Sequence, residues 1–195
     1  MVTALVLAAG ESKRSQPVMK QLYPVQGTAL IDFVVKRLAA ARVSRIRVVL
    51  GYNWEEVRRA IRWEAISKEL EIVVNEEPER GMLSSIRRGL TDEDSYLIFP
   101  VDHPLVRVET MDLLIRAAER QSVPTVIVPV FGGRRGHPVL IPKSMFEDLK
   151  SFNGGNLADF IHARDVEEVD VGDEGVVTNF NTLEQLQKLD KLSGD

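Results

Sequence analysis

Three cationic side chains follow the first apolar run of the chain within one short polar loop. The run covers residues 2–9 and ends at Gly10, and the loop after it holds Lys13, Arg14 and Lys20. An arginine offers a planar fork of donors to a phosphate group, and a lysine offers a mobile point charge. The loop therefore suits a polyphosphate, although the same cations could equally be solvated surface charges.

Small residues at the start of the loop favour the first interpretation. Ala8, Ala9 and Gly10 would let a ligand approach the backbone, whose N–H groups can bind anionic oxygens. The loop contains neither the G-x-x-x-x-G-K-[ST] motif nor the G-x-G-x-x-G motif. It is therefore neither a Walker loop nor a dinucleotide fingerprint.

A carboxylate lies just past a second apolar run, in "SYLIFPVDHPLV". Asp102 follows the run over residues 96–100 and precedes His103 and Pro104. Ligands of open α/β sheets bind outside the carboxyl ends of the strands, so Asp102 would face the same crevice as the first loop. A carboxylate there can hold Mg²⁺, which usually keeps water and bridges substrate phosphates. An aspartate close to a proline is also a common turn former, and the spacing leaves both roles open.

The segment "NEEPERGMLSSIRRGL" places two serines at the start of an amphipathic stretch. Gly81 would permit close backbone approach, and Ser84 and Ser85 would open a helix whose free N–H groups attract polar ligand atoms. The alternative is an ordinary helix whose serines and arginines face water.

The segment "GGRRGHPVLIPKSMF" combines glycines with three donors. Gly133 and Gly136 would shape a tight ribbon, while Arg134, Arg135 and His137 offer donors to a phosphate. The alternative is that His137 packs structurally and the two arginines are solvated.

Apolar runs alternate with helical patterns through most of the chain, which predicts an α/β domain of three layers. Near-continuous hydrophobicity is typical of strands buried on both faces of a parallel sheet, and it occurs at residues 4–8, 46–50, 70–74, 96–100 and 125–130. Helices are expected around residues 30–41, 82–90 and 111–118. Capping boxes are expected to open two more helices, at Asn53 with Glu56 and at Thr182 with Gln185. The glycine-rich segment over residues 130–146 would add a small antiparallel excursion, and residues 1–195 would form a single domain.

Composition excludes several classes of protein. A formal net charge of −4 argues against general nucleic-acid binding and gives no reason to expect adsorption to anionic membranes. The absence of cysteine excludes disulfides, thiolate catalysis and cysteine-ligated zinc. The first apolar run is too short to span a bilayer, so a cytoplasmic protein is expected.

The first loop, "LAAGESKR…K" from Leu7 to Lys20, resembles the signature loop of nucleotidyltransferases with a Rossmann-like fold. The resemblance implies that this loop wraps a nucleoside triphosphate and that its cations steady charge during attack at the α-phosphorus. These roles would fall on Gly10, Ser12, Arg14 and Lys20. The sequence departs from the commoner form because Ser15-Gln16 replace a Met-Gly pair and Lys20 lies one residue farther along.

The same resemblance implies a magnesium site. The family has an aspartate in a context like D-x-P that ligates the catalytic metal, and "PVDHP" places Asp102 there. A second ligand lies before the last helix of the family, where this chain has "TNFNTLEQLQ". Asn179 and Asn181 replace two acids, and Asn181 aligns with the ligand. An amide adds no negative charge, so Mg²⁺ should bind more weakly than with two carboxylates.

The two middle segments resemble molybdopterin cytidylyltransferases in particular, through "G-M-x-S-S-x-x-x-G-L" and "G-x-x-G-H-P-V". This resemblance implies transfer of CMP from CTP to a phosphorylated acceptor of the molybdopterin type, with release of pyrophosphate. Arg134, Arg135 and His137 would bind the acceptor. Two alternatives remain: a cytidylyl- or guanylyltransferase for a small alcohol or sugar phosphate, or a protein that carries a nucleotide or cofactor without turning it over. The implied nucleotide-binding residues are Leu7, Ala8, Ala9, Gly10, Ser12, Gly81, Ser84 and Ser85.

Overall fold

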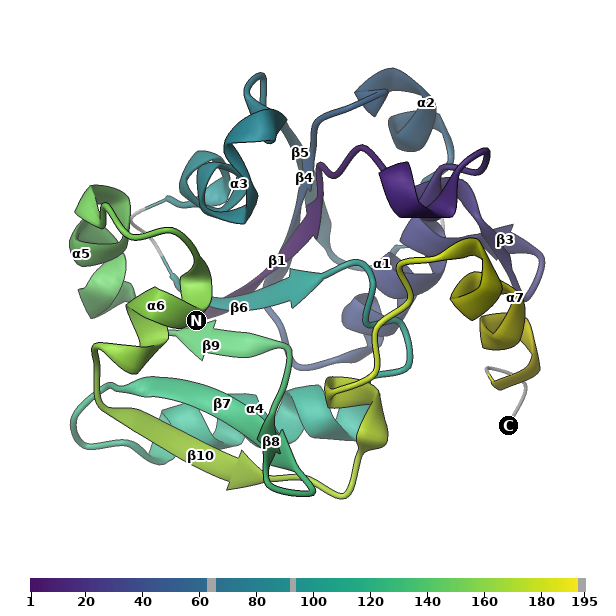
Figure 1. The fold of residues 1–195 in the computed structure, drawn as a ribbon. Helices are drawn as coiled ribbons and strands as arrows, with labels where there is room; N and C mark the ends of the chain where they lie inside the picture. The colour runs from purple at the N-terminus through teal and green to yellow at the C-terminus, as the bar shows by residue number, and fades with distance from the viewer. Residues whose placement is uncertain (63–65, 92–93, 193–195) are drawn as a thin grey trace.

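A mixed β-sheet forms the centre of the protein. The structure, a computed structural model, describes residues 1–62, 66–91 and 94–192. The strands of the main sheet are β1 (Val2–Ala8), β4 (Arg45–Leu50), β5 (Glu69–Val74), β6 (Ser95–Pro100), β7 (Val126–Phe131), β8 (Arg134–Arg135), β9 (Val139–Ile141) and β10 (Val166–Asp170). Their order is β10-β7-β9-β6-β1-β4-β5, and β8 pairs with β7 (Figure 1). A second, two-stranded antiparallel sheet consists of β2 (Pro24–Val25) and β3 (Thr28–Ala29).

Most of the main sheet is parallel, as the sequence predicted. β1 lies between β4 and β6 and is parallel to both, β4 is parallel to β5, and β7 is parallel to β10. The antiparallel excursion is also confirmed, because β9 runs antiparallel to β6 and β7, and β8 runs antiparallel to β7. Each of the five expected apolar runs falls on an observed strand.

Helices cover both faces of the sheet, which gives three layers. They are α1 (Leu30–Ala40), α2 (Trp54–Arg59), α3 (Met82–Gly89), α4 (Val108–Arg120), α5 (Phe146–Ser151), α6 (Leu157–His162) and α7 (Leu183–Leu192). Alternate residues of β1 point to opposite faces. Ala4 and Val6 belong to the core shared with α1, α4 and α7, whereas Leu5 and Leu7 belong to the core shared with α3, α5 and α6. The α/β prediction with a Rossmann-like, three-layer arrangement is therefore confirmed.

One of the two predicted capping boxes is wrong. Helix α2 does begin at Trp54, but Asn53 has a φ of 53° and makes no side-chain capping bond. A capping side chain needs the extended backbone that this left-handed residue lacks. Asn53 instead directs its amide nitrogen at the sulfur of Met19, 3.1 Å away. The box at Thr182 and Gln185 is present, because Gln185 N donates to Thr182 Oγ1 and Gln185 Oε1 accepts from Thr182 N.

Five strands and helices were not anticipated: strands β2, β3 and β10 and the short helices α5 and α6. The sequence of β10 is "VEEVD", and its three acids interrupt the apolar run that would predict a strand. An edge strand needs little apolar surface, so periodicity gives a weak signal there. Among the described residues, no helix combines the length and hydropathy that a membrane crossing requires.

Candidate active site

Two loops meet at the carboxyl ends of β1 and β6, which are neighbouring parallel strands. Leu7 of β1 pairs with Pro100 of β6, so both strands end at the same edge of the sheet. The loop after β1 carries Gly10 and Lys20, and the loop after β6 carries Asp102. These residues line one pocket, as the sequence predicted. The complete lining is Leu7, Ala8, Ala9, Gly10, Lys20, Gln21, Pro78, Gly81, Met82, Ser85, Pro100, Val101 and Asp102.

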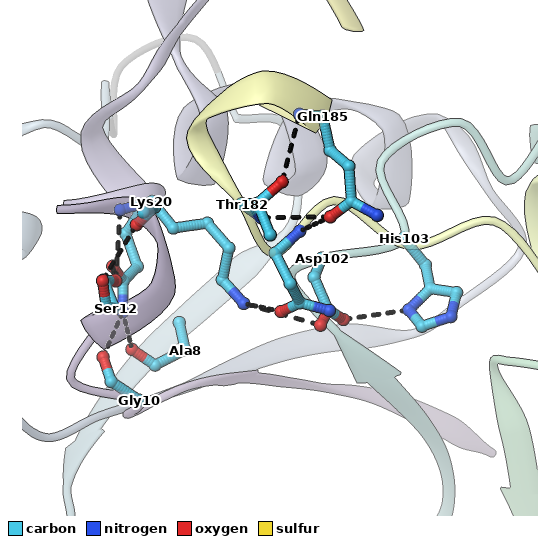
Figure 2. Close-up of polar contacts among 11 residues, drawn as sticks. Ala8, Gly10, Ser12, Lys20, Asp102, His103, Thr182 and Gln185 are labelled. Carbon is cyan, nitrogen blue, oxygen red and sulfur yellow. Dashed lines mark hydrogen bonds and ion pairs between the residues drawn. The ribbon is translucent and has the colours of Figure 1, made fainter. Parts of the chain in front are cut away.

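Lys20, Asp102 and Asn181 form a polar cluster at the edge of this pocket. The ammonium of Lys20 lies 3.4 Å from Asp102 Oδ2 and donates to Asn181 Oδ1 at 2.8 Å. Figure 2 shows the long Lys20 side chain starting beside Ser12 and reaching toward Asp102. The backbone N–H groups of Asn181 and Thr182 both donate to Gln185 Oε1, at 2.8 and 3.0 Å. The start of α7 therefore fixes the backbone that presents Asn181.

Asp102 is held in its ionised form. Burial by itself would raise the pKa of this carboxyl, but the hydrogen bond from His103 and the charge of Lys20 outweigh burial and hold the pKa well below its usual range. His103 Nδ1 lies 2.9 Å from Asp102 Oδ1. Because an ionised carboxylate only accepts hydrogen bonds, Nδ1 must carry the proton of this neighbouring imidazole. His103 therefore fixes one oxygen of Asp102 and leaves the other directed toward Lys20.

The side-chain oxygens of Asp102 and Asn181 fit a magnesium site in which substrate phosphates supply some of the ligands. They already hold a cation between them, the ammonium of Lys20. No group of three or more histidine, cysteine, aspartate or glutamate side chains suited to a metal exists in the part of the chain that the structure describes. Mg²⁺ commonly takes one or two carboxylates and completes its shell with water and substrate phosphates. One carboxylate and one amide oxygen satisfy that pattern, provided that a phosphorylated ligand is present.

Gln21 organises the first loop, a role that no sequence motif indicated. Its side chain is buried, donates to the carbonyl oxygens of Ala8 at 3.0 Å and Gly10 at 2.7 Å, and accepts from Ser12 Oγ at 2.7 Å. Ser12 Oγ in turn accepts from the N–H of Lys20 at 3.1 Å. The side chain of Ser12, which we expected to bind nucleotide, therefore contacts the loop itself. A glutamine after a lysine carries no recognisable motif, so only the fold reveals this role.

Arg14 lies apart from the cluster. It sits in a short 3-10 turn (Lys13–Ser15), its side chain is exposed, and it is absent from the pocket lining. It makes no hydrogen bond or ion pair with any of the described residues. The structure thus brings Lys20 to Asp102 but does not bring Arg14 there.

The start of α3 forms the wall opposite the first loop. Gly81 has a φ of +85°, a conformation that glycine adopts without steric cost. Ser85 lines the pocket, whereas Ser84 faces the preceding turn and donates to the carbonyl oxygen of Gly81 at 2.8 Å. Asn75 donates to both serine hydroxyls, at 2.9 and 3.0 Å. The two predicted serines therefore separate: Ser85 reaches the pocket, and Ser84 stabilises the turn.

The predicted acceptor residues line a second pocket that shares Asp102 with the first. Its lining is Met82, Pro100, Asp102, His103, Arg134, Arg135, Gly136, His137, Val176, Val177 and Asn179. Arg134 is exposed, and Arg135 pairs with Glu168 at 2.6 Å. His137 packs edge-on against His103, with ring centroids 5.0 Å apart.

His137 is an electrically neutral group in this pocket. Burial and, to a smaller extent, the neighbouring His103 lower the pKa of His137 to about 4, and Asp102 partly opposes this shift. Its Nδ1 atom is buried and has no hydrogen-bond partner among the described residues. A ligand donor or a water could satisfy this atom, since buried nitrogen acceptors are costly to leave unpaired.

Gly136 allows the β8–β9 arm to lie against the turn before α7. A Cβ atom on Gly136 would collide with the backbone carbonyl of Val176. The same approach lets His137 N donate to Val176 O at 2.8 Å. The predicted tight ribbon therefore exists, and backbone contact explains the requirement for glycine at this position.

A third, more apolar cavity of about 300 Å³ adjoins the second pocket beneath α6. Its apolar walls come from Val128, Val139, Leu157 and Ile161, and it shares Arg135, Gly136 and His137 with the second pocket. Met82 lines all three pockets and is 43% exposed. Its place at the junction of the pockets is visible only in the folded chain.

A model of the MobA-like NTP transferase domain matches residues 4–169. Nicotine blue oxidoreductase of Paenarthrobacter nicotinovorans is 26% identical to the chain over 199 residues, and the match covers 96% of each protein. Molybdenum cofactor guanylyltransferase of Cupriavidus pinatubonensis is 26% identical over 201 residues, which cover 95% of this chain and 94% of that enzyme.

Among solved structures, a nucleotidyl transferase from Methanothermobacter superposes with a TM-score of 0.80. It is 25% identical in sequence, and the match covers 98% of this chain and 97% of that one. The family match thus spans most of the chain, and the relatives and the shared fold extend over nearly all of it.

Proposed function

Since the chain belongs to the MobA-like NTP transferase domain family and is a nucleotidyltransferase, we propose that it transfers CMP from CTP to a phosphorylated, molybdopterin-type acceptor with the help of Mg²⁺. In this reaction an oxygen of the acceptor phosphate forms a bond to the α-phosphorus of CTP. The bond between the α-phosphorus and the bridging oxygen breaks, and pyrophosphate leaves.

The observation that carries the proposal is the convergence of Gly10, Lys20 and Asp102 on one pocket, with Asp102 shared by a second. A triphosphate in the first pocket and an acceptor in the second would meet at Asp102. An acceptor phosphate is already a nucleophile, so the reaction needs positioning and charge compensation rather than a catalytic triad.

Several of the predicted residues would have separate tasks in this scheme. The small residues Ala8 to Gly10 admit the triphosphate to the backbone, and Lys20 offsets its charge. Arg14 would have to turn inward from its exposed position to add a second cation. Asp102 and Asn181 would hold Mg²⁺, which when bound would neutralise charge on the triphosphate oxygens.

The acceptor side favours a molecule larger than a small alcohol phosphate. The apolar cavity beneath α6 is continuous in its lining with the pocket that contains Arg134 and His137. A phosphate near Arg134 would leave a ring system free to enter the cavity. The choice of a molybdopterin-type acceptor and of CTP rests on the resemblance of the two middle segments, and the guanylyltransferase relative makes GTP the principal competitor.

The proposal is tested by incubating the protein with Mg²⁺, a molybdopterin-type acceptor and each triphosphate in turn, and measuring pyrophosphate release. We expect release with CTP, loss of release on chelation of the metal, and a loss of roughly 10²–10³ in turnover for Asp102→Asn. Asp159→Asn, an exposed position on α6 that lies outside the three pockets, is the control.

Three results would count against parts of the proposal. Selective use of GTP would reject CTP, and turnover with a small sugar phosphate alone would reject the acceptor. Tight binding of CTP without any release of pyrophosphate would favour a carrier that does not turn its ligand over.

A further inference from the structure

Lys20 holds its charged group between the two side chains that would bind the metal. Its ammonium contacts Asp102 Oδ2 at 3.4 Å and Asn181 Oδ1 at 2.8 Å. The side chains of Lys20 and Asp102 are only 15% and 18% exposed, so solvent screens this contact weakly. The ammonium thus donates hydrogen bonds to two side chains on separate loops, and together these side chains form a binding site for a cation.

The oxygens that bind the ammonium are the oxygens that a divalent cation needs. A metal ion and an ammonium carry charge of the same sign and require the same lone pairs, so both cannot occupy the gap between Asp102 and Asn181. His103 occupies the other oxygen of Asp102, at 2.9 Å, which leaves Oδ2 as the oxygen under competition.

We propose that Lys20 competes directly with the divalent cation for Asp102 and Asn181, so that the metal binds tightly only when phosphate groups draw the ammonium away. This inference rests on the magnesium site of the proposed function. It adds that metal binding and triphosphate binding are coupled through one side chain, which by linkage makes each ligand strengthen the other.

The local structure allows the ammonium to move while the backbone stays fixed. The N–H of Lys20 donates to Ser12 Oγ at 3.1 Å, and the residue opens a 3-10 turn (Lys20–Leu22). The four-carbon stem is flexible, and an ammonium has three donors that can be redirected. Because Lys20 lines the same pocket as Gly10, the Lys20 ammonium can reach a triphosphate in that pocket without any change in the loop backbone.

The test measures the dissociation constant for Mn²⁺ in the absence of nucleotide, by electron paramagnetic resonance of the free ion. Lys20→Met and Lys20→Gln should each tighten Mn²⁺ binding about tenfold or more, because they remove both the competitor and its charge. Arg14→Gln removes one positive charge from the same loop without removing a competitor, and should change the constant less than about threefold because exposed charges are screened.

Asp102→Asn distinguishes failure of this inference from failure of the metal site. If Asp102→Asn weakens Mn²⁺ binding and both Lys20 variants tighten it, the competition is established. If Asp102→Asn weakens binding but the Lys20 variants match Arg14→Gln, the inference is overturned and the metal site stands. If Asp102→Asn leaves binding unchanged, the metal site of the proposed function fails, and the inference fails with it. Thermal unfolding of each variant identifies any that do not fold. Because two different residues replace Lys20, one Lys20 variant remains available if the other does not fold.

Discussion

Lys20 donates a hydrogen bond to Asn181 at 2.8 Å, although 161 positions of sequence separate the two residues. This contact joins the loop after the first strand to the turn before the last helix. Asp102, at the end of the central strand β6, lies against the same ammonium. The beginning, middle and end of the chain therefore meet at one polar cluster.

Replacing Asn181 with aspartate should strengthen metal binding. The change adds a negative charge beside Asp102 while keeping an oxygen in place, so the Mg²⁺ concentration for half-maximal pyrophosphate release should fall roughly tenfold. Asn179→Asp adds the same charge two residues away, at an exposed position, and should have a smaller effect. Equal responses of the two variants would mean that Asn181 is not a ligand.

Replacing Gly10 with alanine should impair nucleotide binding without affecting stability. A Cβ atom on Gly10 would meet no protein atom within 4 Å, so the free energy of unfolding should be unchanged. The added methyl group would obstruct a phosphate that approaches the backbone, and calorimetry should show CTP affinity reduced tenfold or more.

Gly136→Ala is the matched contrast to Gly10→Ala. There the Cβ atom would collide with the backbone of Val176, and overpacking of this kind typically costs about 1–3 kcal/mol. Denaturant titration should therefore separate the two variants. If Gly10→Ala binds CTP with unchanged affinity, the triphosphate does not contact the backbone of the first loop at Gly10.

Replacing Gln21 with leucine should loosen the first loop. The buried amide satisfies the carbonyl oxygens of Ala8 and Gly10, and loss of partners for buried polar groups costs about 1–3 kcal/mol. We expect a lower free energy of unfolding together with weaker CTP binding. Gln16→Leu, an exposed change in the same loop, should alter neither quantity. Normal stability and affinity in Gln21→Leu would show that the loop holds its shape without this side chain.

Stability should fall as the pH drops from 7 to 5 because of His137. The pKa of His137 is lowered to about 4, chiefly by burial, so the folded protein resists a proton that the unfolded chain accepts below about 6.5. The unfolded state binds more protons in this window, and the loss should be on the order of 2 kcal/mol.

His137→Gln should remove most of this pH dependence, as measured by denaturant titration at several pH values. His162→Gln replaces an exposed histidine and should leave the dependence as it is in the unsubstituted protein. If the free energy of unfolding depends on pH equally in the unsubstituted protein and in both variants, the low pKa of His137 is contradicted.

The sequence by itself determined the five apolar strands and the general position of the crevice. Continuous apolar runs marked β1 and β6, and neighbouring parallel strands necessarily end at the same edge of a sheet. The small residues before Gly10 and the acid at Asp102 follow those strands directly, so their convergence was predictable. Gly136 was likewise recognisable as part of a tight ribbon.

Only the tertiary structure decided which side chains turn into the crevice. Lys20 points inward and Arg14 outward from the same irregular loop, where no periodicity assigns a direction. Gln21 supports that loop through contacts with the end of β1, and Met82, the first residue of α3, lines three pockets. Strand and helix periods follow from local backbone geometry, whereas the direction of a loop side chain depends on partners that are distant in the chain.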